Sequence, residues 1–341
     1  MRTVRFYTTI AITAISFAAF ASCKRLETDL QESGTSESEM ITINLDLIPD
    51  GMQPATKNFQ NECSNFENEI KTVTICAYDK TGYFAGAEYY SFFDENIGSV
   101  SITLPNGSGY TIFALVNTGN ELDSIPLFQE RLINNTICYL GNAYLFGLPM
   151  AGFTHIEQGT TTATINLRRK FAKFNITIDH SQLPPGYVFS NRSIRVCKGN
   201  HMIRPFIESV QTATNNQTPE FQDREDNLEK TGGGRDTIQE VTLYVPENIM
   251  GDLLPNNTVP ALKTYEALPY PERDCCTYIE FTAVLENGPD APKELIYRFF
   301  PGEDNTSNFN IWGNKIYNIR LVITPESLEG GSWKVSTGDW K

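Results

Sequence analysis

The chain is poor in basic residues and in histidine, and each shortage argues against a class of function. Its 341 residues include 27 Lys and Arg against 41 Asp and Glu, which gives a net charge of −14 and a pI near 4.8. Because nucleic-acid binding needs clustered Lys and Arg that displace counterions, this balance argues against a nucleic-acid partner. The three histidines lie far apart in the sequence, so we interpret each as a surface or loop residue and not a metal ligand: His155, His180 and His201.

Recognisable catalytic motifs are also missing. The sequence contains no HExxH and no GxSxG, and TGGGRD at 231–236 lacks the Lys-Ser or Lys-Thr that ends a phosphate loop. Four nearby acidic residues lack the spacing of an EF-hand, which favours a solvated charged segment over a calcium site: Asp223, Glu225, Asp226 and Glu229. A carboxylate pair for glycoside cleavage stays open, because separation in space is not readable from sequence. We therefore predict no enzyme, no cofactor and no metal.

The cysteines are not arranged for zinc, because no CxxC pair and no nearby histidine cluster occurs. An even number beyond Cys23 permits disulfides in an exported protein. Two alternatives stay open, namely at least one disulfide or buried free thiols. The six cysteines are Cys63, Cys76, Cys138, Cys197, Cys275 and Cys276.

The first 23 residues form an apolar segment with a basic start. Arg2 and Arg5 precede 16 mostly apolar residues at 6–21, which is fewer than the ~20 that a membrane-spanning helix needs. Small residues at 21 and 22 then stand directly before Cys23. We predict that residues 1–22 are the signal peptide of an exported protein. The end of this segment resembles the lipobox of bacterial lipoproteins, in which the cysteine carries acyl chains such as palmitate. An ordinary signal peptide with a cysteine nearby by chance is the alternative.

Short alternating segments follow a polar stretch at 23–39, which we expect to be a flexible tether. Ile41, Ile43, Leu45 and Leu47 alternate with polar residues and predict a half-buried strand. Similar runs rich in β-branched and aromatic residues are separated by turn sequences and lie at 71–79, 99–104, 110–117, 160–167, 174–179, 240–245, 278–286, 294–300 and 315–324. Only 122–134 suggests a turn or two of helix. The pattern predicts an all-β fold built of sandwiches.

The basic cluster RRKFAK, which begins at Arg168, separates two strand-rich halves of similar size. We predict an N-terminal β-sandwich domain at 40–168 and a C-terminal β-sandwich domain at 169–341. The second domain contains a polar stretch at 211–236, which we expect to be a long exposed loop.

Three segments beyond the signal carry a family resemblance. They are LRRKFAKFNITI at 167–178, LYVPEN at 243–248 and YRFFPGEDNTSNFNIWGNKIYNIRLVI at 297–323. The first is similar to a basic-x-x-Ala-Lys strand, with Arg169, Ala172 and Lys173 at the matching positions. In their order and spacing, these segments and the signal ending at Cys23 resemble the fimbrillin superfamily of Bacteroides-type bacteria, the subunits of type V pili.

The resemblance implies two transthyretin-like β-sandwich domains in tandem. It also implies export as a cell outer membrane lipoprotein held by lipid on Cys23, and a place in a fimbrium as a pilus subunit or adhesin. The implied partners are other fimbrial subunits, in a homo- or hetero-polymer, and a host or bacterial surface receptor. The implied work is binding and assembly without catalysis.

The implied assembly mechanism is donor-strand exchange. A protease cuts after a basic residue that follows the first strand, the strand leaves, and a neighbouring subunit's strand replaces it. Here the releasable strand is 40–47, with Ile41, Ile43, Leu45 and Leu47 as inward side chains. The family's cleavage residue is usually arginine, whereas this chain offers Lys57 in MQPATKNF. Without that cut Cys23 is a permanent anchor. The C-terminal ESLEGGSWKVSTGDWK is either a donor segment or a partly packed tail.

A surface lipoprotein that binds or processes glycans is the rival hypothesis. Its candidate walls are the loop at 211–236 and the aromatic segment from Tyr265 to Tyr270. Solvent-facing strand aromatics without a ligand are the simpler explanation of those rings.

Overall fold

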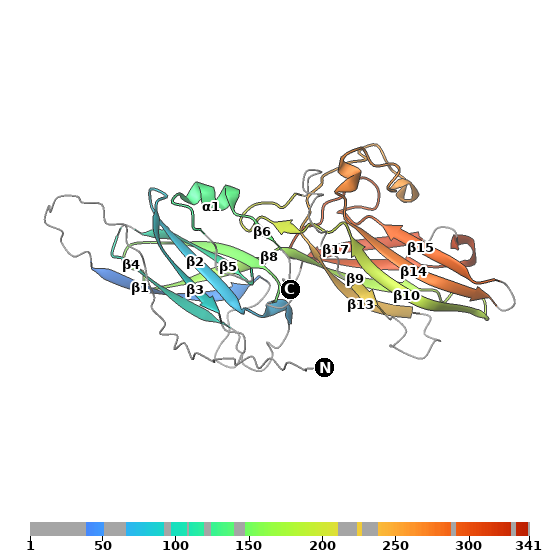
Figure 1. The fold of residues 1–341 in the computed structure, drawn as a ribbon, viewed down its shortest axis with the longest axis horizontal. Helices are drawn as coiled ribbons and strands as arrows, with labels where there is room; N and C mark the ends of the chain where they lie inside the picture. Colours follow the sequence, from blue (N-terminus) through green and yellow to red (C-terminus); the bar gives the residue numbers. More distant parts are fainter. Residues whose placement is uncertain are drawn as a thin grey trace, which may run out of the picture. The chain divides into compact units, whose positions relative to one another are not determined.

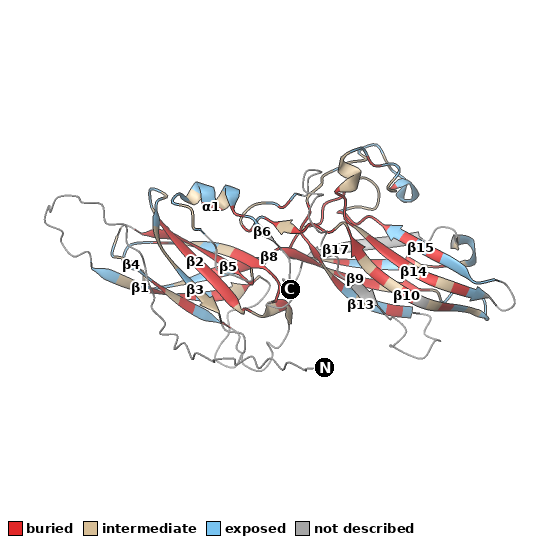
Figure 2. Ribbon diagram, viewed as in Figure 1, coloured by how far each residue is buried: buried red, intermediate tan, exposed pale blue. Residues whose placement is uncertain are grey.

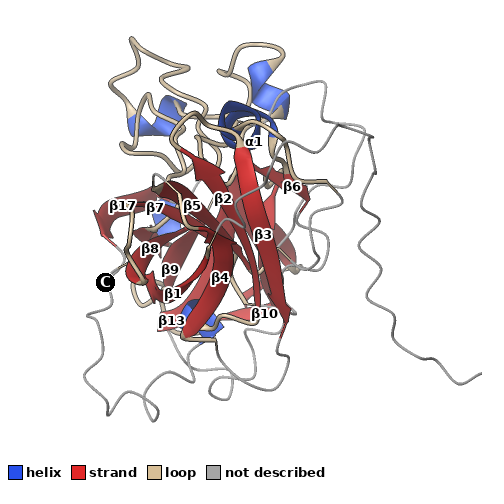
Figure 3. Ribbon diagram, turned by 90° about the vertical axis from the view of Figure 1, so that its left-hand side faces the viewer, coloured by secondary structure: helices blue, strands red, loops and turns tan. Residues whose placement is uncertain are grey.

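Strands dominate the chain, as the alternating segments predict (Figures 1 and 3). The computed structural model describes residues 39–50, 66–91, 97–107, 109–118, 124–139, 147–210, 224–226, 238–287, 291–328 and 332–339. Its strands are β1 Met40–Pro49, β2 Thr72–Asp79, β3 Phe84–Ser91, β4 Ser99–Pro105, β5 Tyr110–Val116, β6 Cys138–Tyr139, β7 Met150–Ile156, β8 Thr162–Arg169, β9 Phe171–Asp179, β10 Tyr187–Cys197, β11 Met202–Ile203, β12 Arg224–Asp226, β13 Ile238–Pro246, β14 Tyr278–Asn287, β15 Lys293–Phe299, β16 Lys315–Val322 and β17 Ser332–Asp339. Helix α1 is Gln129–Asn135, and short 3-10 turns are η2 Phe66–Asn68, η6 Pro260–Leu262, η7 Glu272–Asp274 and η8 Pro325–Ser327.

The first strands form one sheet in the order β3-β2-β5-β7-β8-β1-β4. β7 and β8 pair only through Met150 with Arg169 and Ala151 with Arg168, so the sheet divides there into β3-β2-β5-β7 and β8-β1-β4. One core is shared by the two parts, since Ile43 of β1, Ile75 of β2 and Ile112 of β5 belong to the same buried cluster. The first half is therefore a β-sandwich.

The second strands form two sheets, β12-β10-β14-β15 and β13-β9-β16-β17. Phe174 and Ile176 of β9 and Phe281 of β14 belong to one buried cluster, so these two sheets also enclose a common core. The small β6–β11 sheet pairs Cys138–Tyr139 with Met202–Ile203, which links a segment before β7 to one after β10.

The two halves repeat one topology. In each, the first strand (β1 or β9) lies between an antiparallel partner (β4 or β13) and a parallel partner (β8 or β16). The sheet β3-β2-β5-β7 corresponds, strand for strand and in chain order, to β12-β10-β14-β15. The second half adds β17 on the free side of β16. A repeat at this scale has no counterpart in the sequence, which shows no short-period repeat.

Burial alternates along some strands and is continuous along others (Figure 2). β1 is buried at alternate positions, which is the pattern of a strand with one face on the core. β2 and β5 are buried almost throughout, because their outer face packs against other side chains. Leu132 of α1 and Phe206 cover Tyr78 and Phe113 there. This explains why the segment 110–117 is more uniformly apolar than 41–47.

Several sequence expectations can be checked against these elements. Each predicted run corresponds to a strand, and α1 falls in the predicted helical segment. Residues 224–226 of the expected loop 211–236 form β12, and the C-terminal segment forms β17 and is not an unpaired tail. Five cysteines are buried and unbridged, and Cys63 lies outside the described residues: Cys76, Cys138, Cys197, Cys275 and Cys276.

All the described residues belong to one unit, residues 39–341. The signal peptide at 1–22 and most of the tether at 23–39 lie outside the described residues. Within the described part of the chain, no helix has the length and apolarity to cross a membrane.

Candidate functional site: the first strand and its anchor

β1 occupies a slot with a hydrogen-bonding partner on each side. It pairs antiparallel with β4 from Met40 opposite Pro105 to Asp46 opposite Ser99, and parallel with β8 from Asn44 opposite Thr162 to Pro49 opposite Leu167. Asn44 N donates to Thr161 O at 2.8 Å, and Asp50 N donates to Leu167 O at 2.7 Å. Removing β1 would leave unpaired main-chain groups on both neighbours.

The predicted inward side chains of β1 do face the core. Ile43, Leu45 and Leu47 are buried, and Ile41 is half-buried at the start of the strand. Burial of one such side chain stabilises by about 1.5–3 kcal/mol, so the three buried ones contribute roughly 5–9 kcal/mol. That is comparable to the whole stability of a typical domain, on the order of 5–15 kcal/mol. The slot is therefore stable only when a strand fills it.

Arg169 anchors the end of β1. Its Nη1 donates to Asp50 O at 2.7 Å and to Asn314 Oδ1 at 2.9 Å, and its Nε donates to Glu67 O at 3.1 Å. Nη2 also donates to Asn68 Oδ1. The side chain is fully buried, and burial lowers the pKa of Arg169 while the charges of Glu67 and Asp50 oppose that shift. Asp50 directly follows β1, so Arg169 ties the end of this strand to both η2 and the loop before β16.

Lys173 completes the same anchor from β9. Its Nζ lies 2.5 Å from Glu67 Oε1, which also accepts a hydrogen bond from Tyr244 Oη at 2.8 Å. Glu67 is buried, and a buried carboxylate is stable only when it is paired and hydrogen-bonded. Both basic residues of the basic-x-x-Ala-Lys segment thus hold η2 in place, and Arg169 also holds the end of β1.

A second buried carboxylate, Glu247, lies where β13 ends. Its side chain is 0% exposed, and it accepts from Lys170 Nζ at 2.5 Å and from Arg168 Nη2 at 3.4 Å. The main-chain N–H groups of Ser209 and Gly313 donate to it at 3.0 and 3.1 Å. Burial lowers the pKa of Lys170, and the charge of Glu247 opposes that shift. The glutamate of the LYVPEN segment therefore joins β13 to the chain between β8 and β9.

Gly313 leaves room for this arrangement. A Cβ at this position would lie 2.6 Å from Arg169 O and 2.9 Å from Glu247 Oε2. Neither contact is one that a real Cβ makes, so the loop before β16 requires glycine here. This is a structural reason for the Gly-Asn pair in WGNKIYNI, whose Asn314 contacts Arg169 and Asp50.

Two predicted site residues, Cys23 and Lys57, lie outside the described residues. Sequence reasoning missed Glu67, Asp50 and Asn314 as partners of the basic cluster, because they are distant in sequence and no local pattern marks them.

Other candidate sites offer less. Across the described residues, no three His, Cys, Asp or Glu side chains gather closely enough to hold a metal ion. His155 is exposed and its Nδ1 lies 2.9 Å from Thr111 Oγ1, whereas His201 is a buried residue of the loop between β10 and β11. Tyr265 is covered by the cations of Lys198 and Arg273, at 5.1 and 5.5 Å from its ring centroid.

Comparison with known proteins addresses the fold. Residues 243–321 match a family described as a domain of unknown function, DUF4906. No curated protein sequence is significantly similar to the chain. Similar solved structures include proteins provisionally assigned to cell adhesion from Parabacteroides distasonis (TM-score 0.58, 13% identity, covering 89% of this chain and 97% of that one) and Bacteroides eggerthii (0.57, 14%, 89% and 97%).

A third similar structure is the tip fimbrial protein Mfa3 from Porphyromonas gingivalis, at TM-score 0.51 and 13% identity, covering 88% of this chain and 99% of that one. Identities this low speak to the fold alone. The chain has the fold of fimbrial and cell adhesion proteins of Bacteroidales, in agreement with the fimbrillin resemblance of its sequence.

Proposed function

We propose that this chain is a fimbrial subunit or adhesin made of two transthyretin-like β-sandwich domains, at 40–168 and 169–341. In this proposal a lipid on Cys23 holds it at the outer membrane, and it is displayed on the cell surface in a fimbrium. Its work is binding and assembly, without catalysis, and its partners are other fimbrial subunits and a surface receptor. Assembly proceeds by donor-strand exchange after a cut at Lys57.

The position of β1 carries the proposal. β1 contributes a full set of main-chain hydrogen bonds and three buried side chains, yet residues 51–65 alone link it to the rest of the sandwich. A cut between 51 and 65 would leave β1 held by non-covalent contacts only, with the Arg169–Asp50 bond among them. A strand from another subunit that offers apolar side chains at alternate positions would regain the same contacts.

Proteolysis under native conditions tests this function. The protein without residues 1–22 would be treated with a lysine-specific protease, and its products would be separated on SDS gels without boiling. We expect a cut at Lys57 followed by SDS-resistant multimers. The Lys57→Gln variant should remain uncut at this position and monomeric.

Lys80→Gln is the matched control, because Lys80 is also an exposed lysine of the first half, with 56% of its side chain accessible. It should assemble like the unaltered protein. Complete cleavage at Lys57 with a monomeric product would refute the polymerising subunit, and β1 would then be a permanent part of the fold.

Glycan binding is the second candidate, and one exposed ring favours it. Tyr270 is 73% exposed, and the guanidinium of Arg273 lies 5.5 Å from its ring centroid. A cation on one face of the ring would hold it in place and leave the other available for stacking on a sugar. A glycan array with the unaltered protein and Tyr270→Ala tests this: a glycan bound by both equally would remove Tyr270 from the proposal.

A further inference from the structure

Among the strands that the structure describes, none pairs with the edge of β8 that faces away from β1 along most of its length. Asn44 N donates to Thr161 O and Asp50 N to Leu167 O, so the main-chain groups of odd-numbered residues 161–167 face β1. Those of the even-numbered residues point to the opposite side. Among the described strands, only β7 pairs on that side, and only at Arg168 and Arg169. Thr162, Thr164 and Asn166 are exposed.

This edge also lacks the usual protection against pairing. Exposed edges are commonly blunted by charged residues, proline or a bulge. The segment TTTATINL at 160–167 contains no charge, no proline and no glycine, and its register with β1 is regular. Threonine and isoleucine fill five of these eight positions and favour an extended strand. The edge is thus available to a further strand.

The second half shows how such an edge is filled. β16 is the counterpart of β8, because each is the parallel neighbour of the first strand in its half. β16 carries β17 antiparallel on its other side, from Lys315 opposite Asp339 to Val322 opposite Ser332. In the first half, the described residues provide no strand at the equivalent position. The shared topology therefore contains one strand position that is filled in one half and open in the other.

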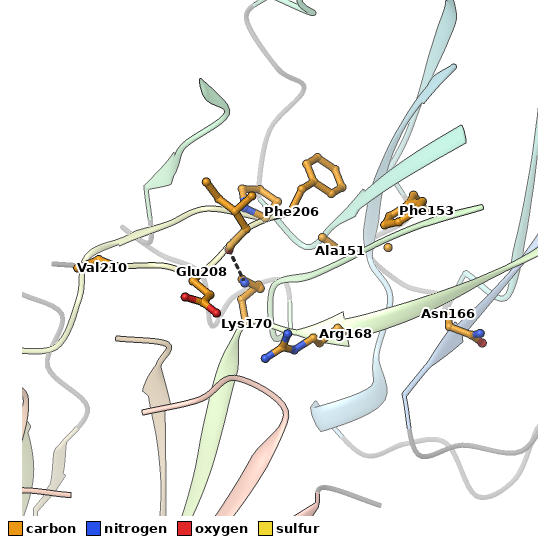
Figure 4. Close-up of a pocket in the computed structure, with 11 residues that line it drawn as sticks. Ala151, Phe153, Asn166, Arg168, Lys170, Phe206, Glu208 and Val210 are labelled. Atoms are coloured by element: carbon orange, nitrogen blue, oxygen red, sulfur yellow. Dashed lines mark hydrogen bonds between the residues drawn. The ribbon is translucent and has the colours of Figure 1, made fainter. Parts of the chain in front are cut away.

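A cavity of about 740 Å³ lies beside this open edge, where β7 separates from β8. Phe153 and Phe206 lie on one side of it, and Arg168 and Asn166 lie on the other (Figure 4). Phe153 is 55% exposed although its ring lies 5.5 Å from that of buried Phe113. A Cβ on Gly152 would come within 2.1 Å of Asn166 O, so β7 approaches β8 closely only because residue 152 has no side chain. β7 therefore covers the outer side of Asn166, and the open part of the edge ends at Thr164.

The charged residues around the cavity indicate which charge a bound partner would carry. Lys170 is committed to Glu247 and to Ile207 O, at 2.5 and 3.0 Å. Arg168 is 46% exposed and makes two long contacts, to Glu247 at 3.4 Å and to Gly313 O at 3.5 Å. Its guanidinium therefore retains the capacity to bind a carboxylate at two points. Glu208 also lines the cavity and would repel a second carboxylate.

We propose that the outer edge of β8 at Thr162 to Thr164 and the adjoining cavity form a docking surface for an extended strand of a partner protein. The strand adds antiparallel to β8, as β17 does to β16. Its residues are mainly uncharged, one large apolar side chain enters the cavity against Phe153 and Phe206, and one acidic side chain binds Arg168. This surface lies on the opposite side of β8 from β1, so it does not rest on the release of β1.

A designed peptide provides the test. The probe is a fluorescent eight-residue peptide of alternating threonine and valine with one phenylalanine and one aspartate, and its binding to the protein is measured by fluorescence anisotropy. We expect saturable binding. Methylation of the main-chain nitrogens that face β8 should weaken it at least about tenfold, because those hydrogen bonds supply the affinity. Replacing the aspartate with asparagine should weaken it about fivefold or more.

Variants of the protein locate the site. Thr164→Pro removes an N–H that is not bonded to β1, so the strand should persist while peptide binding falls at least about tenfold. Thr164→Val keeps the N–H and should bind within about twofold. A peptide in the place of β1 would pair with the odd-numbered residues and would tolerate proline at 164. Undiminished binding by Thr164→Pro, equal binding of the methylated peptide, or no saturable binding by the unaltered protein would each overturn the proposal.

Discussion

The two halves of this protein share a strand plan but differ in how their first strands are attached. β9 begins at Phe171, with only Lys170 between it and the end of β8, and its other end continues towards β10. Two cuts would be needed to separate β9 from the chain around it. β1 precedes the rest of its sandwich, so one cut between 51 and 65 would separate it from residues 66–341. The first strand of the second half is therefore covalently continuous with its domain at both ends, whereas a single cut would separate the first strand of the first half.

Compensating contacts appear where β1 ends. Arg169 and Asn314 hold Asp50, although they lie 119 and 264 residues further along the chain. The second half thus supplies the anchor that the connectivity of the first half lacks. Under the proposed function, a strand held this way would be stable until it is cut and replaceable afterwards.

The largest expected effect concerns the buried pair near the meeting of β8 and β9. Glu247→Ala would leave Lys170 buried without its partner and should lower the free energy of unfolding by about 3–5 kcal/mol. Glu157→Ala is the matched control, since its pair with Lys80 is exposed, and should cost less than about 1 kcal/mol. Urea denaturation measures both. Equal losses would mean that the buried pair does not connect the halves energetically.

The next effect distinguishes β1 from β9, the first strands of the two halves. Leu45→Ala in β1 and Ile176→Ala in β9 each delete a fully buried aliphatic side chain and should each cost about 2–5 kcal/mol. Only Leu45→Ala should also accelerate release of β1 after cleavage, which native gel electrophoresis of the cut protein would follow. If Ile176→Ala accelerated release equally, the proposed difference between the strands would fail.

A smaller effect probes the anchor. Arg169→Lys keeps the charge but loses the planar guanidinium that reaches several acceptors, and should cost about 1–3 kcal/mol. Amide hydrogen exchange should become faster in β1 and stay unchanged in β13. Arg298→Lys, at a half-exposed arginine bound to Glu280, serves as control and should change neither strand of interest.

The smallest effect is a pH dependence of the second half. Lys263 is buried, its Nζ donates to Asp304 O at 2.9 Å, and burial lowers its pKa from 10.5 to about 8. Between about pH 8 and 10.5 the unfolded state binds the proton and the folded state does not, so this group makes stability rise with pH across that window. The contribution is lost as pH falls through 8.

Lys263→Met should remove this slope, measured as the difference in unfolding free energy between variant and unaltered protein at several pH values. Lys80→Met, at an exposed lysine of the first half, should leave the slope in place. A slope that persists in Lys263→Met would assign the dependence to another group.

Sequence patterns foretold the strands with a clear alternation and missed those without one. β3 has no fully buried position, because it is an edge strand with Gly86 and two alanines, so no apolar face marks it. β10 carries a register shift between Ser190 and Ser193, which breaks the period of two. β17 contains a glycine and two charged residues, which do not favour a strand, yet its pairing with β16 holds it.

The sequence identified some residues of the site but not the residues with which they pair. The basic cluster marked the passage from one half to the other, and the Glu of LYVPEN was a motif without a role. The pairing of Lys170 with Glu247, and of Lys173 with Glu67, spans 77 and 106 residues of sequence. Periodicity reports which positions are buried and not which distant residue they meet, so such partners emerge only from the folded chain.

The buried cysteines bear on how such a protein can be remodelled. Burial raises the pKa of Cys76, Cys138 and Cys276 to about 12, so these thiols are protonated and unreactive near neutral pH. The five described cysteines form no covalent bridge between strands. Their strands are fastened by packing and hydrogen bonds alone, so exchange of one strand for another would require no reductant. Replacement of β1 by another strand would then require only that its hydrogen bonds and side-chain contacts break and re-form, and it would not depend on the redox state of the surroundings.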